Sequence, residues 1–325
     1  MPRITLAVMA YKQQDFIADA VRSALAQACE PIEILLSDDC SPDGTLGMMQ
    51  AMASAYRGPH QVIVRRNETN LGIGGHYNEI MRASSGQLLV LMAGDDLSTS
   101  DRVHRLAQAW DQGGGKADLL ASHLHDMSFD GRTLGMVKVD DLSQWQDVRD
   151  WARRRPYVVG AAHAVTRRLF DRFGPLLPGV SHEDQVNTLR AIASGGACTV
   201  DAPLVHYRRG GMSGAITDAS PAAFLARMRR RNELHLALHR QWLADARLLG
   251  CEALVARAFA HDHERELFIR AQVNATSWVD RWQAVQAHRD LPLAWRLRRT
   301  IYLGAPSWAL KVQATKAVMA RKRDR

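Results

Sequence analysis

The stretch Leu88-Leu-Val-Leu-Met-Ala-Gly-Asp95-Asp96 decides the fold class of this 325-residue chain. Its five large apolar residues in a row are typical of a strand buried on both faces, as in a parallel sheet covered by helices. Two carboxylates follow directly, at the end of the strand where an open α/β sheet binds its ligand. Because adjacent carboxylates repel each other, Asp95 and Asp96 indicate either a cation site or a solvated turn that begins a helix.

Strand and helix patterns alternate before this stretch. We expect strands over residues 4–9, 32–36 and 61–65, with helices over 19–27 and 45–56 and a further helix after Asn70. Repeated units of this length predict a right-handed connection between parallel strands. The sequence therefore predicts an α/β fold with a wound, mostly parallel sheet and a C-terminal α-helical region.

The pattern changes twice along the chain. It weakens between about residues 110 and 156, and after Gly214 it becomes long Ala-, Leu- and Arg-rich segments with helical spacing. We expect three parts: an α/β half over residues 1–100, a second half over 101–217, and a helical, basic region over 218–325.

The composition is that of an ordinary globular protein, with 46% hydrophobic and 23% charged residues. The four cysteines are scattered without a CxxC pair, which argues against a zinc site and is typical of a reducing compartment. The sequence shows neither an apolar run of membrane-spanning length nor a secretory signal, so we expect a cytoplasmic protein.

The positive charge is concentrated at the C-terminal end. Nine basic residues and one acidic residue lie between Leu291 and Arg325, so this segment carries the whole formal net charge of +8. Apolar residues line up at helical spacing on two segments here, Leu293, Leu297 and Ile301 on one and Trp308, Val312, Thr315 and Met319 on the other. This pattern suits either contact with an anionic membrane surface or a helical cap packed on the preceding domain. We expect no nucleic-acid binding, because acidic strand ends would repel phosphate and no recognition motif is present.

Polar loops follow the four expected strands, at Ala10-Tyr11, Ser37–Thr45, Asn70–Asn78 and Gly94–Ser98. In a wound sheet these loops meet at one edge. Tyr11 could stack on a base, Asp38 or Asp39 could accept from a base or ribose, and Arg66 could neutralise a diphosphate. A turn or capping role ahead of Thr45 is the alternative for both aspartates. The sequence contains no P-loop, and the glycines at 72–75 lack the dinucleotide-binding spacing.

A second acidic pair stands in Ser181-His182-Glu183-Asp184-Gln185, just before an expected helix over 186–193. Acids in a first turn interact favourably with the helix dipole, so a structural role is one interpretation. The other is that one acid serves as general base for a sugar hydroxyl. A zinc-protease motif is excluded because position 186 is Val186 and not histidine.

The ordered set of motifs resembles the inverting glycosyltransferases of family 2, which have the A-type glycosyltransferase fold. The resemblance runs from Ile4 to about Ser213. It is carried by Ala7-Val-Met-Ala-Tyr11, Ser37-Asp-Asp-Cys-Ser-Pro-Asp-Gly-Thr45, Asn70-Leu-Gly72 with Asn78, Asp95-Asp96, the segment from Gly160 to Arg168, Glu183-Asp184 and His206-Tyr207-Arg208. The chain departs from the family in two places: the acidic motif lacks a leading acid, and Cys40 replaces a glycine.

This resemblance implies that the protein moves a sugar from a nucleotide-diphosphate donor to a hydroxyl acceptor with inversion. The implied setting is bacterial surface polysaccharide or glycolipid synthesis, with a glycan or lipid-linked acceptor, at the inner face of the cytoplasmic membrane if the tail binds there. Residues 1–100 would bind the nucleotide sugar and 101–217 the acceptor. Asp184 would be the general base. Asp96 would ligate a divalent metal, Mn²⁺ or Mg²⁺, or hold the donor sugar. The implied donor-binding residues are Ala10, Tyr11, Asp39, Arg66, Asn70 and Asp95, and the acceptor-side residues are Gly160 and Glu183.

Two other classes remain as alternatives. A sugar-nucleotide nucleotidyltransferase would carry a glycine-rich basic loop after its first strand, where this chain has Ala10-Tyr11-Lys12-Gln13. A non-catalytic scaffold with a degenerate sugar site is the second alternative, because the acidic motif is altered.

Overall fold

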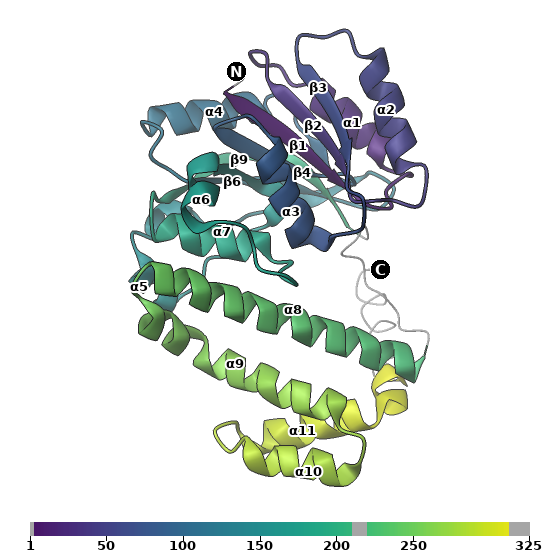
Figure 1. The fold of residues 1–325 in the computed structure, drawn as a ribbon, viewed down its shortest axis with the longest axis vertical. Coiled ribbons are helices and arrows are strands. Elements are labelled where there is room, and N and C mark those ends of the chain that lie inside the picture. Colours follow the sequence, from purple (N-terminus) through teal and green to yellow (C-terminus); the bar gives the residue numbers. More distant parts are fainter. Residues whose placement is uncertain (1–2, 210–219, 312–325) are drawn as a thin grey trace. The chain divides into compact units, whose positions relative to one another are not determined.

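The computed structural model describes residues 3–209 and 220–311 (Figure 1). These residues form two compact units. The first contains residues up to 209 together with 241–254, and the second contains 220–240 together with 255–311. The last turns of one long helix and the start of the next thus belong to the first unit.

The first unit is built on one sheet. Its strands are β1 (Ile4–Ala10), β2 (Glu33–Asp38), β3 (Gln61–Arg66), β4 (Leu88–Ala93), β5 (Leu97–Ser98), β6 (Leu119–Met127), β7 (Thr133–Val137), β8 (His163–Thr166) and β9 (Ala197–Arg208). They lie in the order β3-β2-β1-β4-β8-β6-β9-β5, with β7 paired to β6.

The N-terminal half of this sheet is parallel, which confirms the predicted fold class. β3, β2, β1 and β4 all run in the same direction, with Val8 aligned between Leu36 and Met92. β8 then runs antiparallel to both β4 and β6, whereas β6 and β9 are parallel. The sheet is therefore mixed, and the antiparallel β8 is a short strand of four residues that follows the weakly patterned segment.

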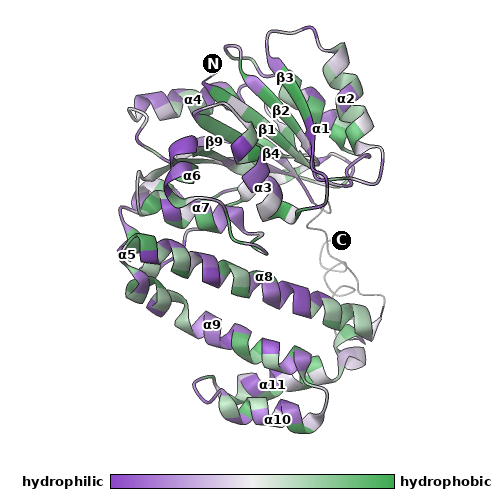
Figure 2. Ribbon diagram, in the orientation of Figure 1, coloured by the Kyte–Doolittle hydropathy of each residue, from purple (hydrophilic) through white to green (hydrophobic). Residues whose placement is uncertain are grey.

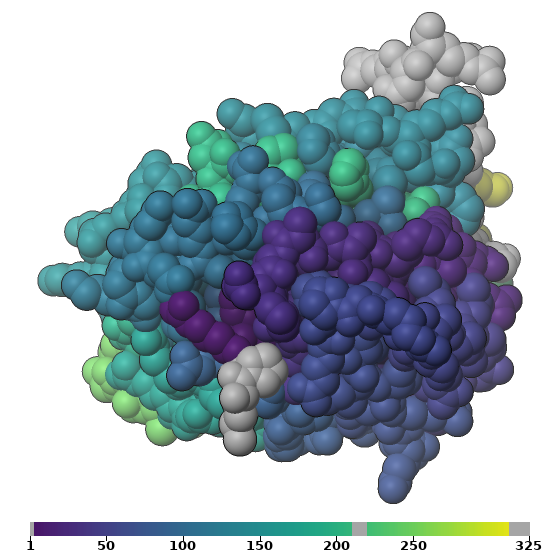
Figure 3. All heavy atoms as spheres, turned by 90° about the horizontal axis from the view of Figure 1, so that it is seen from above, coloured from purple at the N-terminus to yellow at the C-terminus, as the bar shows by residue number. Residues whose placement is uncertain are grey.

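Helices cover the sheet and connect its strands. They are α1 (Ile17–Leu25), α2 (Thr45–Ala55), α3 (Gly72–Ala83), α4 (Arg102–Gln112), α5 (Val148–Arg153), α6 (Arg167–Phe173) and α7 (Glu183–Ile192), with short 3₁₀ turns η1 (Leu142–Gln144) and η2 (Gly160–Ala162). In Figure 3 the surface of the N-terminal part, in purple and dark blue, adjoins the lighter blue and teal surface of the segment after β4.

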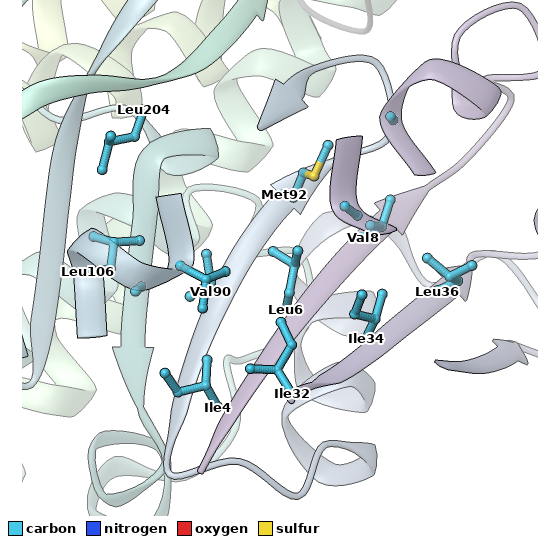
Figure 4. Close-up of a cluster of buried hydrophobic side chains, with 14 of the residues drawn as sticks. Ile4, Leu6, Val8, Ile32, Ile34, Leu36, Val90, Met92, Leu106 and Leu204 are labelled. Carbon is cyan, nitrogen blue, oxygen red and sulfur yellow. The ribbon is translucent and has the colours of Figure 1, made fainter. Parts of the chain in front are cut away.

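The apolar runs that predicted the strands form the core. Leu6, Val8, Ile34, Leu36 and Val90 are fully buried and belong to one cluster (Figure 4). In Figure 2 the central strands are correspondingly green. Burying each such side chain contributes roughly 1.5–3 kcal/mol, so this core fixes where each strand ends and where its polar loop begins.

Helix α7 is anchored by a buried ion pair within the first unit. The Arg190 guanidinium donates to both carboxylate oxygens of Asp245, at 2.8 and 3.0 Å. Trp242, one turn before Asp245, packs its ring edge-on against Trp151 at 5.0 Å. These contacts hold the helix that begins with Glu183 and Asp184.

The second unit is helical. It contains the first part of α8 (Pro221–Leu248), most of α9 (Glu252–Asn274), α10 (Trp278–Ala287) and α11 (Leu293–Gly304). Within the described ranges no helix combines the length and the apolarity that crossing a membrane would need. Val312, Thr315 and Met319, which the sequence placed on one face of a basic helix, lie outside the described residues.

Candidate active site

The carboxyl ends of β1, β2 and β4 lie side by side at one edge of the sheet. Ala10 is aligned with Asp38, and Met9 with Ala93. The loops after these strands are tied together, because the Lys12 amide donates to Ser41 Oγ at 3.0 Å and the Gln13 amide donates to Thr45 Oγ1 at 2.9 Å. The structure thus brings the predicted polar loops to one edge.

The backbone at Gly94, directly before Asp95 and Asp96, lies too close to its neighbours to carry a side chain. The Gly94 amide donates to the Met9 carbonyl at 2.9 Å, which holds the two strand ends together. A Cβ at position 94 would collide with Gln13 Oε1. A side chain is therefore excluded immediately before Asp95 unless Gln13 moves.

Asp39 is buried and joins β2 to the start of α3. One carboxylate oxygen accepts from Asn67 Nδ2 at 2.7 Å and from the Leu71 amide at 2.9 Å, and the other accepts from the Gly72 amide at 2.9 Å. Asn70 donates its side-chain amide to the Asp39 carbonyl at 3.3 Å. The carboxylate therefore satisfies backbone N–H groups that the helix itself leaves unpaired.

We expect Asp39→Ala to destabilise the protein. The substitution removes three hydrogen bonds to a charged acceptor and leaves buried donors unsatisfied, a loss of about 3 kcal/mol in the free energy of unfolding. Urea unfolding measures it, with Asp130→Ala in an exposed turn as the control. An Asp39→Ala protein as stable as the control would contradict this capping role.

Arg66, the last residue of β3, lies beside Asp38 at the end of β2 and Cys40 in the loop that follows it. Arg66 Nη2 is 3.5 Å from Cys40 Sγ and 3.4 Å from the Ser41 carbonyl, and its Nε is 3.7 Å from Asp38 Oδ2. Cys40 adopts a positive φ of 60°, a conformation that glycine takes without strain. The backbone here thus requires the conformation that the family's glycine would supply.

Asp96 is almost fully buried, and only one of its oxygens has a hydrogen-bond partner in the described part of the chain. Oδ1 accepts from the Arg208 amide at 2.8 Å, whereas Oδ2 has no hydrogen-bond partner among the described residues. Burial, and then the charge of Asp95, raise the pKa of Asp96 to about 7. A buried carboxylate with a free oxygen favours a proton or a cation.

Arg208, the last residue of β9, contacts the acidic pair Asp95-Asp96 through its side chain as well as its backbone amide. Its Nε donates to the Asp95 carbonyl at 2.9 Å and its Nη1 to the Phe129 carbonyl at 2.7 Å. The guanidinium also lies 4.7 Å from the ring centre of Phe16. These contacts fix the backbone of Asp95 and Asp96.

Sequence reasoning missed Arg102, which is fully buried behind the acidic pair. Its Nη2 donates to the carbonyls of Leu91 at 2.8 Å and Ala161 at 2.9 Å, so it links β4 to η2. Burial lowers the pKa of Arg102 to about 10, against the opposing effect of Asp96, and the group stays charged at neutral pH. An arginine at the start of an amphipathic helix gave no local signal for this position.

The second acidic pair lies against η2. Glu183 and Asp184 are half-buried in the first turn of α7, and a Cβ at Gly160 would lie 2.6 Å from Glu183 Oε1 and 3.4 Å from Asp184 Cβ. Burial raises the pKa of both carboxyls, and the charge of Asp184 adds to the rise at Glu183. Asp184 Oδ1 accepts from the Gln185 amide at 2.7 Å.

The two acidic pairs are therefore joined through one short turn. Arg102 links the strand that carries Asp95 and Asp96 to Ala161, and the neighbouring Gly160 packs on Glu183 and Asp184. The sequence placed these pairs more than 80 residues apart without a contact between them. Such a site offers one buried acid for a cation and one acid with raised proton affinity for proton transfer.

The acidic residues at Asp95 and Asp96 suit a hard divalent cation that takes its remaining ligands from a bound phosphate and from water. Among the described residues no group of three or more His, Cys, Asp or Glu side chains could hold a metal ion. Asp96 Oδ2, which has no hydrogen-bond partner among the described residues, and the neighbouring carboxylate of Asp95 are the acidic groups at this position. Both could bind a cation only through oxygen. Mg²⁺ and Mn²⁺ suit such a site, since they bind through one or two carboxylates and take their other ligands from phosphate and water.

The chain is similar to several known proteins. The chain is 28% identical over 326 residues to the succinoglycan biosynthesis protein ExoO of Rhizobium meliloti (strain 1021), covering 92% of this chain and 87% of that protein. It resembles the crystal structure of S. aureus TarS in complex with UDP-GlcNAc (TM-score 0.55, 18% identity, 92% of this chain and 88% of that chain).

It also resembles the mannosyltransferase PcManGT from Pyrobaculum calidifontis in complex with GDP-Man and Mn²⁺ (TM-score 0.52, 16% identity, 96% of this chain and 86% of that chain). At these identities the two solved structures support the fold. The profile of the glycosyl transferase family 2 matches residues 5–169, about half of the chain. The chain therefore belongs to glycosyl transferase family 2.

Proposed function

We propose that the protein transfers a sugar from a nucleoside-diphosphate donor to a hydroxyl acceptor with inversion at the anomeric carbon. The observation that carries this function is the pairing of two acidic sites across η2. One holds a buried carboxylate with a free oxygen, and the other holds two carboxyls of raised pKa at a helix start. Family membership supports the class of reaction.

The donor would lie along the edge formed by β1, β2 and β4. Tyr11 would stack on the base, and Ala10, Asp39 and Asn70 lie in or beside the same loops. Arg66 is exposed and can face the diphosphate. Asp96, with Asp95 beside it, would hold the divalent cation, which would neutralise charge on the departing diphosphate. UDP-GlcNAc and GDP-Man, bound by TarS and PcManGT, are the first donors to test.

Asp184 would remove the proton of the acceptor hydroxyl as its oxygen attacks the anomeric carbon. Attack from the face opposite the leaving diphosphate forms one bond while the other breaks, so the configuration inverts without a covalent intermediate. Gly160 lets η2 pack directly against Glu183 and Asp184. Glu183 would position the acceptor hydroxyl. A raised pKa suits a base that must take up a proton near neutral pH.

The acceptor would be a glycan or a lipid-linked sugar in surface polysaccharide or glycolipid synthesis. The similarity to a succinoglycan biosynthesis protein over most of the chain supports this setting. We place the reaction on the cytoplasmic side of the membrane, with the basic segment 291–325 near the lipid surface.

Product analysis tests this function. Purified protein is incubated with Mn²⁺, a panel of nucleotide sugars and prenyl-diphosphate-linked sugar acceptors, and the anomeric configuration of the product is determined by NMR. We expect turnover with one nucleotide class and inverted products. Retention of configuration would contradict the single displacement, and absence of turnover with every pair would favour the scaffold alternative that the altered acidic motif raises.

A further inference from the structure

Helix α11 exposes one apolar stripe, although it buries two polar residues together with Leu303. Leu293 and Ile301 are 54% and 51% exposed, and Leu297 lies between them on the same stripe. Arg296, by contrast, is only 8% exposed. A helix at a protein–water boundary normally shows the reverse arrangement, with apolar residues toward the core.

Two polar residues of α11, Arg296 and Thr300, are buried. Arg296 Nη1 donates to the Val285 carbonyl, but its Nε and the Thr300 hydroxyl have no hydrogen-bond partner among the described residues. Leaving such groups unsatisfied destabilises the folded protein. Removing Leu293, Leu297 and Ile301 from water would stabilise this orientation of the helix.

Helix α10 adds large apolar side chains beside α11. Trp278, Val279 and Trp282 are all more than half exposed, and their spacing places them on one side of the helix. A Cβ at Gly304, the last residue of α11, would lie 2.8 Å from the Trp278 ring. The exposed side of α10 therefore adjoins the end of α11.

The surface is preformed and basic. A capping box between Ser277 and Asp280 fixes the start of α10. Arg289, Arg298 and Lys311 are exposed. Over residues 278–311 the sequence has six basic and two acidic residues, and one of the acids is the capping Asp280. Tryptophan and leucine flanked by arginine are typical of helices that lie in the interface of an anionic bilayer.

We infer that the α10–α11 face, defined by Trp278, Val279, Trp282, Leu293, Leu297 and Ile301, docks into the surface of an anionic lipid bilayer. The apolar side chains enter the boundary between headgroups and acyl chains, and the basic residues pair with lipid phosphates. A second copy of the chain is disfavoured as the occupant because the two basic rims would repel each other. Docking here needs no donor or acceptor, so it stands apart from the proposed catalysis.

Vesicle co-sedimentation of the full chain tests this surface. Vesicles of equal parts phosphatidylglycerol and phosphatidylcholine are compared with pure phosphatidylcholine vesicles. We expect Trp282→Gln/Ile301→Gln to lower the partition coefficient on anionic vesicles by about tenfold or more, because two large apolar side chains no longer leave water. We expect the wild type to bind pure phosphatidylcholine about tenfold more weakly than anionic vesicles.

The matched control is Leu134→Gln/Tyr157→Gln, which alters two apolar residues of the first unit with similar exposure. It should bind vesicles like the wild type, and thermal unfolding verifies that both variants fold. Failure of the wild type to bind anionic vesicles, or equal binding by the Trp282/Ile301 variant, would overturn the inference. The inference would also be overturned if light scattering showed that the wild type is a dimer and that the Trp282/Ile301 variant is a monomer. Donor-induced thermal shifts of the same samples report on the catalytic site separately.

Discussion

Asp184→Asn should lower the rate of sugar transfer by about 10³-fold while leaving donor affinity within about twofold of the wild type. General-base catalysis contributes typically 10²–10⁴-fold, and the amide cannot accept the acceptor proton. Because this interaction acts on the transition state, its loss lowers kcat and spares ground-state binding.

We expect Asp184→Asn to leave the local structure unchanged. Asparagine keeps an oxygen that can accept from the Gln185 amide, so the first turn of α7 retains its hydrogen bond. Burial raises the pKa of Asp184, so kcat/KM of the wild type should increase with pH as this carboxyl loses its proton. Glu183→Gln, the neighbouring control, should keep that pH dependence. A comparable loss of donor affinity in Asp184→Asn would identify this residue as a binding or structural residue instead.

Asp96→Asn should raise the thermal stability of the metal-free protein at pH 8 and abolish its response to Mn²⁺. The folded-state pKa of Asp96 is about 7, above its ordinary value of 3.8. Ionising this carboxyl in the folded state therefore opposes folding, at a cost that is zero below about pH 4, grows with pH and is complete above about pH 7. The full cost is on the order of 4 kcal/mol.

Asparagine removes that cost and retains an oxygen for the Arg208 amide. The stabilisation should shrink as the pH is lowered from 8 toward 4, since wild-type Asp96 is then protonated. Mn²⁺ should stabilise the wild type at pH 8 and lose affinity below about pH 7, where protons compete for the carboxylate. Scanning calorimetry at several pH values, with Asp130→Asn as an exposed control, measures both effects. A destabilised metal-free variant at pH 8 would show that ionised Asp96 contributes to folding.

The N-terminal half of the fold could be predicted because its strands are buried on both faces. Apolar runs of this kind depend little on which neighbours they pair with, and β1 to β4 fall within two residues of their expected positions. β8 has only four residues and pairs with β4, more than 70 residues earlier in the chain. Its direction depends on tertiary contacts, which local periodicity does not encode.

The contrast between local pattern and tertiary contact also explains which parts of the candidate site could be predicted from the sequence. Loops after strongly apolar strands could be placed at one edge, but the partners of Asp39 lie about 30 residues away in α3. Burial of Arg102 depends on carbonyls from β4 and η2. On α11 the spacing correctly placed Leu293, Leu297 and Ile301 on one side, yet it could not show that this side is exposed.

A thermal-shift screen of UDP-, GDP-, dTDP- and CMP-linked sugars, with and without Mn²⁺, tests the central claim most directly. A ligand that binds only the folded state raises its stability by mass action. We expect one nucleotide class to raise the unfolding temperature of the wild type, more strongly with Mn²⁺, and the metal-dependent part to vanish in Asp96→Asn. A donor shift that is equal in both proteins and independent of Mn²⁺, or no shift with any donor, would contradict a metal-assisted nucleotide-sugar site at Asp96.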